Sequence, residues 1–236
     1  MQLYYAPTLL QSSFLDETES HHCVRVLRGK QGDNIRVTNG IGTVVEAVIT
    51  EANAKRVTFE ILSTAQKALP TCHKLHIAIA PTKSIDRFEW FVEKAAEIGI
   101  GTITPIICKH SERKTVRIDR LNNILLSAMK QSINYWLEKV NEPIEFTKFL
   151  NEPGFENQKF IAYCEEKPDE HLYNLMSSNA STIILIGPEG DFTPQELKLA
   201  IDKGYKTCSL GEKRLRTETA AIVACHTFAM QSIKKI

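Results

Sequence analysis

Two glycine-containing segments contain residues whose types and spacing could form a ligand-binding site. The first runs from an apolar stretch at 183–186 through Gly187-Pro-Glu-Gly190 to Thr193 and Pro194, which should begin a helix. In parallel sheets, ligands bind beyond the carboxyl ends of the strands, and glycine lets the backbone approach them closely. A plain strand-to-helix turn is the alternative interpretation of these residues.

The second segment, residues 210–220, also follows an expected strand and begins an expected helix, with Thr217 as its N-cap. It carries the charged residues Lys213, Arg214, Arg216 and Glu218. Neither segment has the Gly-x-Gly-x-x-Gly fingerprint or a phosphate-binding loop. Because Gly187 and Gly211 end two strands of one sheet, we expect both loops to line one crevice that holds a nucleotide-like ligand through backbone groups.

These loops belong to a region in which strands and helices alternate. Apolar runs predict strands at 75–80, 102–108, 160–164, 182–186 and 206–210. Helical spacing or capping signals predict helices at 85–98 (ended by Gly99), 118–140, 193–204 and 217–235. This alternation is typical of an α/β domain with a mainly parallel sheet.

The first seventy residues are typical of β structure. β-Branched residues predict strands at 35–38, 43–49 and 56–62, with Asn39-Gly40 as a tight turn between the first two. Short strands at this spacing suggest a small closed barrel. Residues 69–71 could join two domains, so we expect domains at 1–70 and 71–236.

The composition is that of an ordinary folded protein. The chain has 236 residues, of which 43% are hydrophobic and 24% are charged. The formal net charge of +1 neither requires nor excludes nucleic acid as a partner. No apolar run approaches the roughly 20 residues that span a bilayer, and the N-terminus does not resemble a signal peptide. We therefore expect a cytoplasmic protein.

The cysteines and histidines give little sign of disulfides or metal. The six cysteines include no Cys-x-x-Cys pair, so we expect reduced thiols in the core. Cys72, His73 and His76 lie close together in the sequence, but no second cluster stands at a ligand-like spacing. We expect no metal site.

Two basic clusters could contact phosphates. The first consists of Arg25, Arg28, Lys30 and Arg36 around one acid, Asp33. The second consists of Lys109, His110, Arg113, Lys114, Arg117 and Arg120, with Glu112 and Asp119 among them. Basic runs are often merely solvated surfaces, but two of them on a nearly neutral protein favour phosphate-binding faces.

Several motifs in one chain order resemble the RsmE family of 16S ribosomal RNA uridine-N3 methyltransferases, in the SPOUT superfamily. The resemblance covers nearly the whole chain. The matching motifs are Gly187-Pro-Glu-Gly190, Leu210-Gly-x-x-x-Leu215-Arg216-Thr-Glu-Thr-Ala220, His22-x-x-x-Val26-Leu-Arg28, Lys83 with Arg87, Lys94-Ala-x-Glu97-Ile-Gly99, and Gln131-Ser132. The chain departs from the family pattern at Asp191, at Lys213-Arg214 and at Asn134-Tyr135, where the family commonly has Gly, Arg-Ile and Gly-Arg.

The resemblance implies a PUA-like RNA-binding barrel followed by a SPOUT methyltransferase domain with a deep trefoil knot, and a homodimer. It implies S-adenosylmethionine as the cofactor. By matching positions, the cofactor would contact Glu165, Ile186, Gly187, Gly190, Leu210, Leu215 and Arg216. The 16S RNA of the small ribosomal subunit would contact His22, Arg25, Arg28, Lys30, Lys83, Arg87, Arg113 and Lys114.

The implied reaction needs a nucleophilic N3 on a uracil ring. N3 gains that character when its proton leaves, which a general base and donors near the two carbonyl oxygens both favour. Arg216 is the expected donor and Glu218 the expected base, with Glu189 in reserve. Glu218 could instead be a carboxylate that stabilises a helix N-terminus.

Two other functions remain open. One is a related knotted methyltransferase that acts on another RNA position, such as a ribose hydroxyl. The other is a non-catalytic RNA-binding factor for ribosome assembly. The His22–Arg28 motif favours the RsmE reading over the first, and the intact loops at 187–190 and 216–220 favour it over the second.

Overall fold

The computed structural model describes residues 2–152, 154, 157–163, 170–177 and 180–232. The chain forms two compact units. One consists of Met1–Pro70 with Leu126–Leu137, and the other of Thr71–Leu125 with Glu138–Ile236. In the described part of the chain, no helix is long and apolar enough to cross a membrane.

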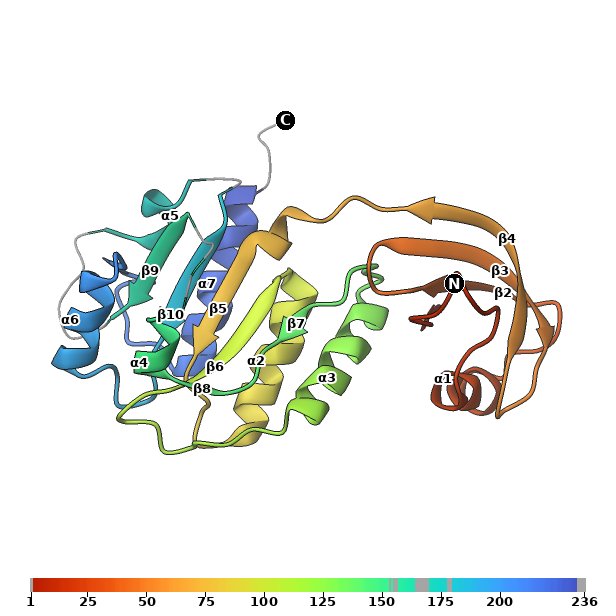
Figure 1. Cartoon of the computed structure of the whole chain (residues 1–236), viewed down its shortest axis with the longest axis horizontal. Coiled ribbons are helices and arrows are strands. Elements are labelled where there is room, and N and C mark those ends of the chain that lie inside the picture. Colours follow the sequence, from red (N-terminus) through yellow and green to blue (C-terminus); the bar gives the residue numbers. More distant parts are fainter. Residues whose placement is uncertain (1, 153, 155–156, 164–169, 178–179, 233–236) are drawn as a thin grey trace. The chain divides into compact units, whose positions relative to one another are not determined.

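The N-terminal unit is built on a four-stranded sheet. Its order is β1 (Leu3–Tyr5), β2 (Asn34–Thr38), β3 (Thr43–Glu51) and β4 (Thr58–Gln66) (Figure 1). β1 is parallel to β2, and the other neighbours are antiparallel. The strands expected from β-branched residues are thus confirmed, although β4 begins and ends later than its sequence pattern predicts.

The segment 13–15, which follows β1, pairs with the beginning of β4. The N–H of Leu15 donates to the oxygen of Val57, and the N–H of Phe59 donates to the oxygen of Ser13. The short helix α1 (Glu17–His21) and the π-helical turn η1 (His22–Val26) follow. The apolar residues of these elements form one core: Tyr4, Ala6, Leu9, Leu15, Cys23, Ile35, Val37, Val45, Ala47, Ile49, Val57 and Phe59.

Helix α3 (Ile118–Gln131) is shorter than its sequence predicts. The expected helix over 118–140 is wrong beyond Gln131, because Ile133 has a φ of 56° and so cannot continue a right-handed helix. The N–H of Asn134 donates to the oxygen of Met129 and closes the last turn. Apolar residues continue past this point in the sequence, which is why their periodicity predicts a helix longer than the observed one.

The residues after α3 pack against the N-terminal sheet. The hydroxyl of Tyr135 accepts a hydrogen bond from Arg36, and Trp136 forms a β-bridge with Ile41. From α3, the Nζ of Lys130 donates to the carboxylate of Glu19; the side chain of Glu19 is buried and that of Lys130 is half-buried. This is why Leu126–Leu137 belongs to the N-terminal unit.

The C-terminal unit contains a seven-stranded sheet in which all described pairings are parallel. Its main order is β11-β9-β10-β5-β6-β7, and β8 also pairs with β6. The strands are β5 (Leu75–Ile79), β6 (Thr102–Ile107), β7 (Lys139–Val140), β8 (Ile144–Glu145), β9 (Gln158–Ala162), β10 (Thr182–Ile186) and β11 (Lys206–Cys208). The expected parallel α/β sheet is confirmed.

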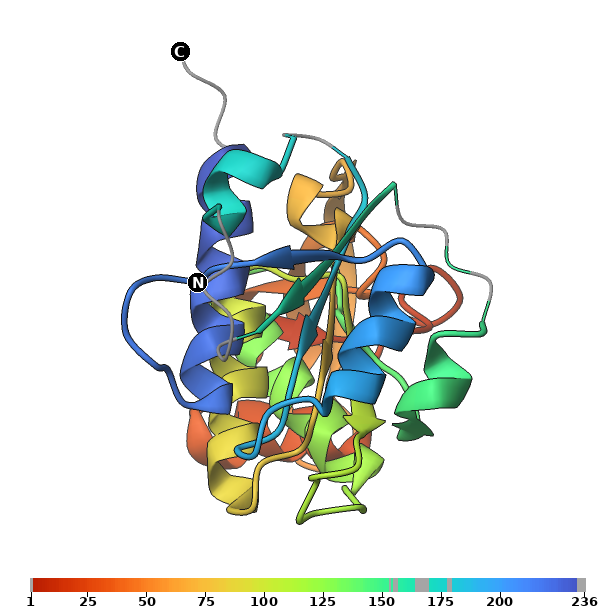
Figure 2. The same ribbon diagram turned by 90° about the vertical axis from the view of Figure 1, so that its left-hand side faces the viewer.

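Helices cover both faces of this sheet (Figure 2). α2 (Ile85–Ile98) and α7 (Thr217–Ser232) pack together on one face. α4 (Phe146–Phe149) and α6 (Pro194–Asp202) share a core with the other face. The short η2 (Thr71–Lys74) and α5 (Leu172–Leu175) complete the unit.

The helix boundaries follow the sequence signals closely. α2 ends where Gly99 takes a φ of 114°. α6 begins with the expected capping box, in which Thr193 and Glu196 bond reciprocally. The prediction that Thr217 caps α7 is wrong: Thr217 is the first helical residue, and the oxygen of Arg216 accepts the first intrahelical bond, from Ala220.

Candidate functional site

The loops that carry the candidate functional residues meet at one edge of the parallel sheet. Because β5, β6, β10 and β11 run in the same direction, the loops that follow them leave at their common carboxyl end. The connections after the neighbouring strands β5 and β10 leave toward opposite sides of the sheet: β5 leads to β6 on one side, and β10 leads to β11, beyond β9, on the other. Ligand sites in α/β sheets form at such points.

Side chains from the segment after β11 hold two carbonyls of the loop after β10. The hydroxyl of Thr217 donates to the oxygen of Gly187 at 3.1 Å. The Nη2 of Arg214 donates to the oxygen of Glu189 at 3.2 Å. The loops at 187–191 and 210–217 are therefore bonded together, as the sequence predicts for two loops that line one site.

The loop after β6 holds the next two carbonyls. The Nδ1 of His110 lies 2.9 Å from the oxygen of Gly190 and 3.1 Å from that of Asp191. Because a carbonyl can only accept, Nδ1 carries the hydrogen in this arrangement. His110 was expected only as part of a basic cluster, since no spacing in the sequence brings it to a loop eighty residues later.

The glycines of the 187–191 loop face protein rather than open space. A Cβ on Gly187 would lie 3.1 Å from the ring of Phe192, and one on Gly190 would lie 3.1 Å from the Cβ of His110. Asp191 has a φ of 59°, a left-handed conformation. This explains why glycine is common there in the resembling family, and Asp is among the residues that tolerate it best.

The apolar candidates for the cofactor differ in exposure. Ile186 is buried at the end of β10, whereas Leu210 and Leu215 are half-buried after β11. Between them, Gly211 has a φ of 138°, and nothing lies within 4 Å of a Cβ placed there. Glu165, the remaining candidate, lies outside the described residues.

The two candidate catalytic residues have different surroundings. Arg216 is exposed, and within the described residues its guanidinium has no ion-pair or hydrogen-bond partner. The carboxylate of Glu218, only 10% exposed, has Oε1 3.8 Å from the Nε of Arg87. Arg87 and Glu218 lie in the first turns of the two packed helices α2 and α7.

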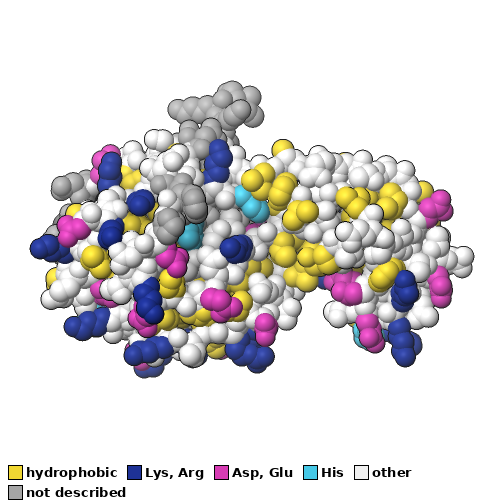
Figure 3. Space-filling model, in the orientation of Figure 1, with side chains coloured by type: hydrophobic (Ala, Val, Ile, Leu, Met, Phe, Trp, Pro, Cys, Tyr) yellow, Lys and Arg dark blue, Asp and Glu magenta, His cyan; other side chains and the backbone are white. Residues whose placement is uncertain are grey.

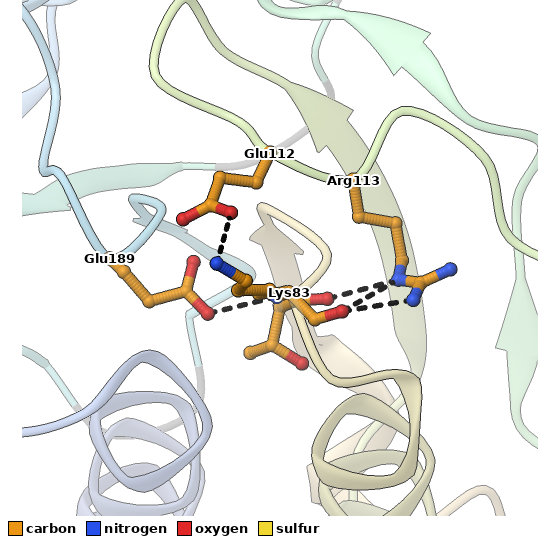
Figure 4. A network of polar contacts seen from close by, with 5 residues as sticks. Lys83, Glu112, Arg113 and Glu189 are labelled. Atoms are coloured by element: carbon orange, nitrogen blue, oxygen red, sulfur yellow. Dashed lines mark hydrogen bonds and ion pairs between the residues drawn. The ribbon is translucent and has the colours of Figure 1, made fainter.

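Lys83 and Arg113, both candidates for RNA contact, have partners within the protein (Figure 4). The Nζ of Lys83 pairs with Glu112 at 2.8 Å, and its backbone N–H donates to Oε1 of Glu189 at 2.9 Å. The guanidinium of Arg113 donates to the oxygens of Thr82 and Lys83. Lys114, the next residue, is exposed.

The RNA candidates of the N-terminal unit lie around η1. His22 is half-buried, while Arg25, Arg28 and Lys30 are exposed. Arg28 has a φ of 58°, so the chain turns sharply after the π-helical residues. In the view of Figure 3, side chains of Lys and Arg are interspersed with those of Asp and Glu.

Five cysteines, at positions 23, 72, 108, 208 and 225, are free thiols, whereas Cys164 lies outside the described residues. Burial raises the pKa of the Cys108 and Cys225 thiols, and it raises the pKa of Cys208 to about 12. Among the residues that the structure describes, no three His, Cys, Asp or Glu side chains gather as metal ligands would.

Comparisons with known proteins agree with this architecture. An RNA methyltransferase domain matches residues 69–229, and an RNA methyltransferase PUA domain matches residues 15–62. A ribosomal RNA small subunit methyltransferase E of Rickettsia conorii is 30% identical over 229 residues, which cover 94% of this chain and 92% of that protein.

Solved structures of two similar proteins have a similar fold. A probable rRNA-methyltransferase from Porphyromonas gingivalis is 37% identical with a TM-score of 0.91, and each chain covers 98% of the other. A ribosomal RNA small subunit methyltransferase E from Neisseria gonorrhoeae, solved bound to S-adenosyl methionine, is 26% identical with a TM-score of 0.89 and the same coverage.

The expected α/β methyltransferase domain behind a PUA domain is thereby confirmed, while the trefoil knot stays a prediction. Two findings decide the family of this chain: it is 30% identical to the Rickettsia conorii protein over nearly its whole length, and the RNA methyltransferase domain matches residues 69–229. This chain belongs to the ribosomal RNA small subunit methyltransferase E family.

Proposed function

We propose that this protein transfers the methyl group of S-adenosylmethionine to N3 of a uridine in the 16S RNA of the small ribosomal subunit. One observation carries the proposal: the carbonyls of the 187–191 loop are held by Thr217, Arg214 and His110 at the carboxyl edge of the sheet. The loop is thus shaped by the protein itself, as a site that binds a ligand through backbone groups requires.

The residues around this loop fit S-adenosylmethionine. Within the described residues, the backbone N–H groups of Glu189 and Gly190 have no hydrogen-bond partner, so they can donate to a ligand. Leu210 and Leu215 offer half-buried apolar surface next to the open space at Gly211. With Ile186, Gly187, Arg216 and Glu165, these residues form the proposed cofactor site. When bound, the cofactor supplies a methyl group on a positively charged sulfur.

Arg216 is the proposed donor to the uracil ring. As N3 loses its proton, negative charge collects on the flanking carbonyl oxygens, and a guanidinium aimed at one of them stabilises that charge. Arg216 is exposed, so its guanidinium can reach a substrate. A donor of this kind contributes about 10²–10³ in rate.

Glu218 is the proposed acceptor of the N3 proton. It lies two residues from Arg216, in the first turn of α7. Its distance of 3.8 Å from Arg87 is longer than a hydrogen bond, so its carboxylate oxygens keep lone pairs for a proton. A purely structural role at the helix N-terminus is the competing explanation.

Single-turnover methylation with saturating RNA and cofactor tests both roles. We expect Arg216→Ala to slow the reaction about 10²–10³-fold even when the cofactor is saturating, and Arg216→Lys to recover part of the rate because it keeps the charge without the planar fork. A near-normal rate for Arg216→Ala would remove the catalytic role. Glu218→Gln removes the base and also the charge that faces Arg87 and the helix N-terminus, so a structural role would lower stability in denaturation curves along with the rate, whereas a catalytic role would lower the rate alone.

The N-terminal unit is the proposed docking surface for RNA, through His22, Arg25, Arg28 and Lys30. In the C-terminal unit, Lys83, Arg87 and Lys114 are the remaining candidates, because the guanidinium of Arg113 is engaged by the oxygens of Thr82 and Lys83. We expect the triple variant Arg25→Ala, Arg28→Ala, Lys30→Ala to bind RNA more weakly and with a shallower salt dependence, because fewer counterions are released. Its cofactor affinity should not change. An unaltered salt slope would exclude this surface.

A homodimer is the proposed assembly. α7 has buried residues on one side, yet Met230 on the same helix and Trp90 on the neighbouring α2 are about half exposed. Apolar side chains on two packed helices favour a partner that covers them. Light scattering on the purified protein should give twice the chain mass.

A ribosomal RNA substrate further implies that the protein acts in the cytoplasm.

Nucleoside mass spectrometry of 16S RNA from cells with and without the protein is the decisive experiment. Loss of one N3-methyluridine supports the proposal. Loss of a ribose methyl group would support the related methyltransferase instead. A protein that binds RNA but not S-adenosylmethionine in calorimetry would be an assembly factor.

A further inference from the structure

The backbone of Lys83 is held from both sides by loops that follow other strands. Its N–H donates to Oε1 of Glu189 at 2.9 Å. Its carbonyl oxygen accepts from Nη2 of Arg113 at 2.9 Å and from Nε at 3.2 Å (Figure 4). We call this arrangement, Lys83 with Glu189 and Arg113, the Lys83 clamp.

The clamp connects three loops. Lys83 follows β5, Arg113 follows β6 thirty residues later, and Glu189 follows β10, 106 residues after Lys83. Both sets of bonds involve a charged group, which makes them stronger than bonds between neutral groups. Because the donor and the acceptor of one residue are used at once, a displacement of either neighbouring loop breaks a bond.

The side chain of Lys83 adds little to this connection. Its pair with Glu112 joins side chains that are 73% and 54% exposed, and exposed ion pairs contribute little to stability. The clamp therefore depends on backbone atoms at position 83 and on the side chains at 113 and 189. Variants of Arg113 and Glu189 can test it without altering Lys83.

We propose that Glu189 and Arg113 are positioning residues that act through the backbone of Lys83 to fix the 187–191 loop for the methyl donor. The inference rests on the proposed function of that loop. It gives the carboxylate of Glu189 the role of a hydrogen-bond acceptor rather than a proton acceptor. It gives the guanidinium of Arg113 the role of a loop anchor rather than a ligand for RNA phosphate.

Two variants of Glu189 separate positioning from base catalysis. Glu189→Gln keeps an oxygen that can accept from Lys83, but its amide cannot take up a proton at neutral pH. We expect Glu189→Gln to keep kcat and its pH profile within about twofold. Glu189→Ala should lower S-adenosylmethionine affinity about two- to tenfold, as the loss of one hydrogen bond predicts.

Two results would overturn this assignment. If Glu189→Gln lost as much activity as Glu189→Ala, with a changed pH profile, Glu189 would act as a base. If Glu189→Ala bound the cofactor with unchanged affinity, the clamp would not position the loop.

Arg113 is tested against its neighbour. Calorimetry without RNA should show that Arg113→Lys and Arg113→Ala both weaken S-adenosylmethionine binding about two- to tenfold, because an ammonium cannot reproduce the fork that reaches the carbonyls of Thr82 and Lys83. Lys114→Ala removes an adjacent exposed cation and should leave cofactor affinity unchanged. Unchanged cofactor affinity in both Arg113 variants would overturn its role as a positioning residue.

Hydrogen exchange gives a readout that does not depend on activity. The amide of Lys83, followed by NMR, should be protected in the wild type and in Glu189→Gln, and should exchange faster in Glu189→Ala. A rapidly exchanging Lys83 amide in the wild type would overturn the clamp while leaving the proposed function intact. A protected amide in a protein that methylates no RNA would instead refute the proposed function alone.

Discussion

The contact between Lys130 and Glu19 should be essential to the N-terminal unit. The two side chains are only 16% and 4% exposed, and the other oxygen of Glu19 accepts from the N–H of Tyr5 at 3.2 Å. Lys130→Met keeps the aliphatic packing but leaves the Glu19 carboxylate buried without a cation. Removing one partner of a buried ion pair typically costs about 3–5 kcal/mol.

Urea denaturation measures this cost. Of the two tryptophans in the chain, Trp136 lies in the N-terminal unit and Trp90 in the other, so a Trp90→Phe background makes the fluorescence of Trp136 specific. With m-values of about 1–3 kcal/mol/M, Lys130→Met should lower the urea midpoint by at least ~1 M. Adding Glu19→Gln should restore most of the loss, because it removes the unpaired charge.

Glu46→Gln is the matched control within the same unit. It breaks the pair of Glu46 with Arg36, whose side chains are 38% and 28% exposed, and such pairs contribute at most about 1 kcal/mol. If Lys130→Met cost no more than Glu46→Gln, the buried pair would not stabilise the unit. If Glu19→Gln worsened the loss, the argument from an unpaired charge would be refuted.

Three further outcomes are expected. Gly187→Ala should destabilise the protein by about 1–3 kcal/mol in denaturation curves as well as weaken cofactor binding, because its Cβ would press on the buried ring of Phe192; unchanged stability would contradict this. Burial lowers the pKa of His73 below 6.5, so the unfolded state binds protons more readily and stability should fall as pH drops through about 6.5, less steeply in His73→Gln. Burial raises the pKa of Cys72 to about 11, so its alkylation at pH 7.5 should be slow until the protein is unfolded.

Elements with a local signal were predictable from the sequence. α2 ends at Gly99 because only the conformational freedom of glycine allows its φ of 114°. Thr193 and Glu196 stand at the spacing of a capping box, which predicts the start of α6. The strands β5, β6 and β10 follow their apolar runs. The placement of two glycine loops at one sheet edge followed from parallel topology alone.

Features that depend on distant residues could not be predicted in this way. Ile133 adopts a left-handed conformation that its residue type disfavours, so the end of α3 carries no sequence signal. The contacts of His110 with Gly190 and of Arg113 with Lys83 join loops that only the folded sheet brings together. The sequence shows that His110 and Arg113 are basic residues, but only the folded structure shows which groups they contact.

The membership of Leu126–Leu137 in the N-terminal unit has a consequence for synthesis. The first seventy residues emerge from the ribosome without Lys130 and Trp136, their partners in the folded unit. At about 5–20 residues per second, the intervening stretch of roughly 67 residues takes roughly 3–13 s to make. During that time Glu19 has no cation and the surface around Gly42 has no tryptophan. The unit that would dock on RNA can therefore be completed only after β5 and β6, the first two of the seven strands in the methyltransferase domain's sheet, have been made.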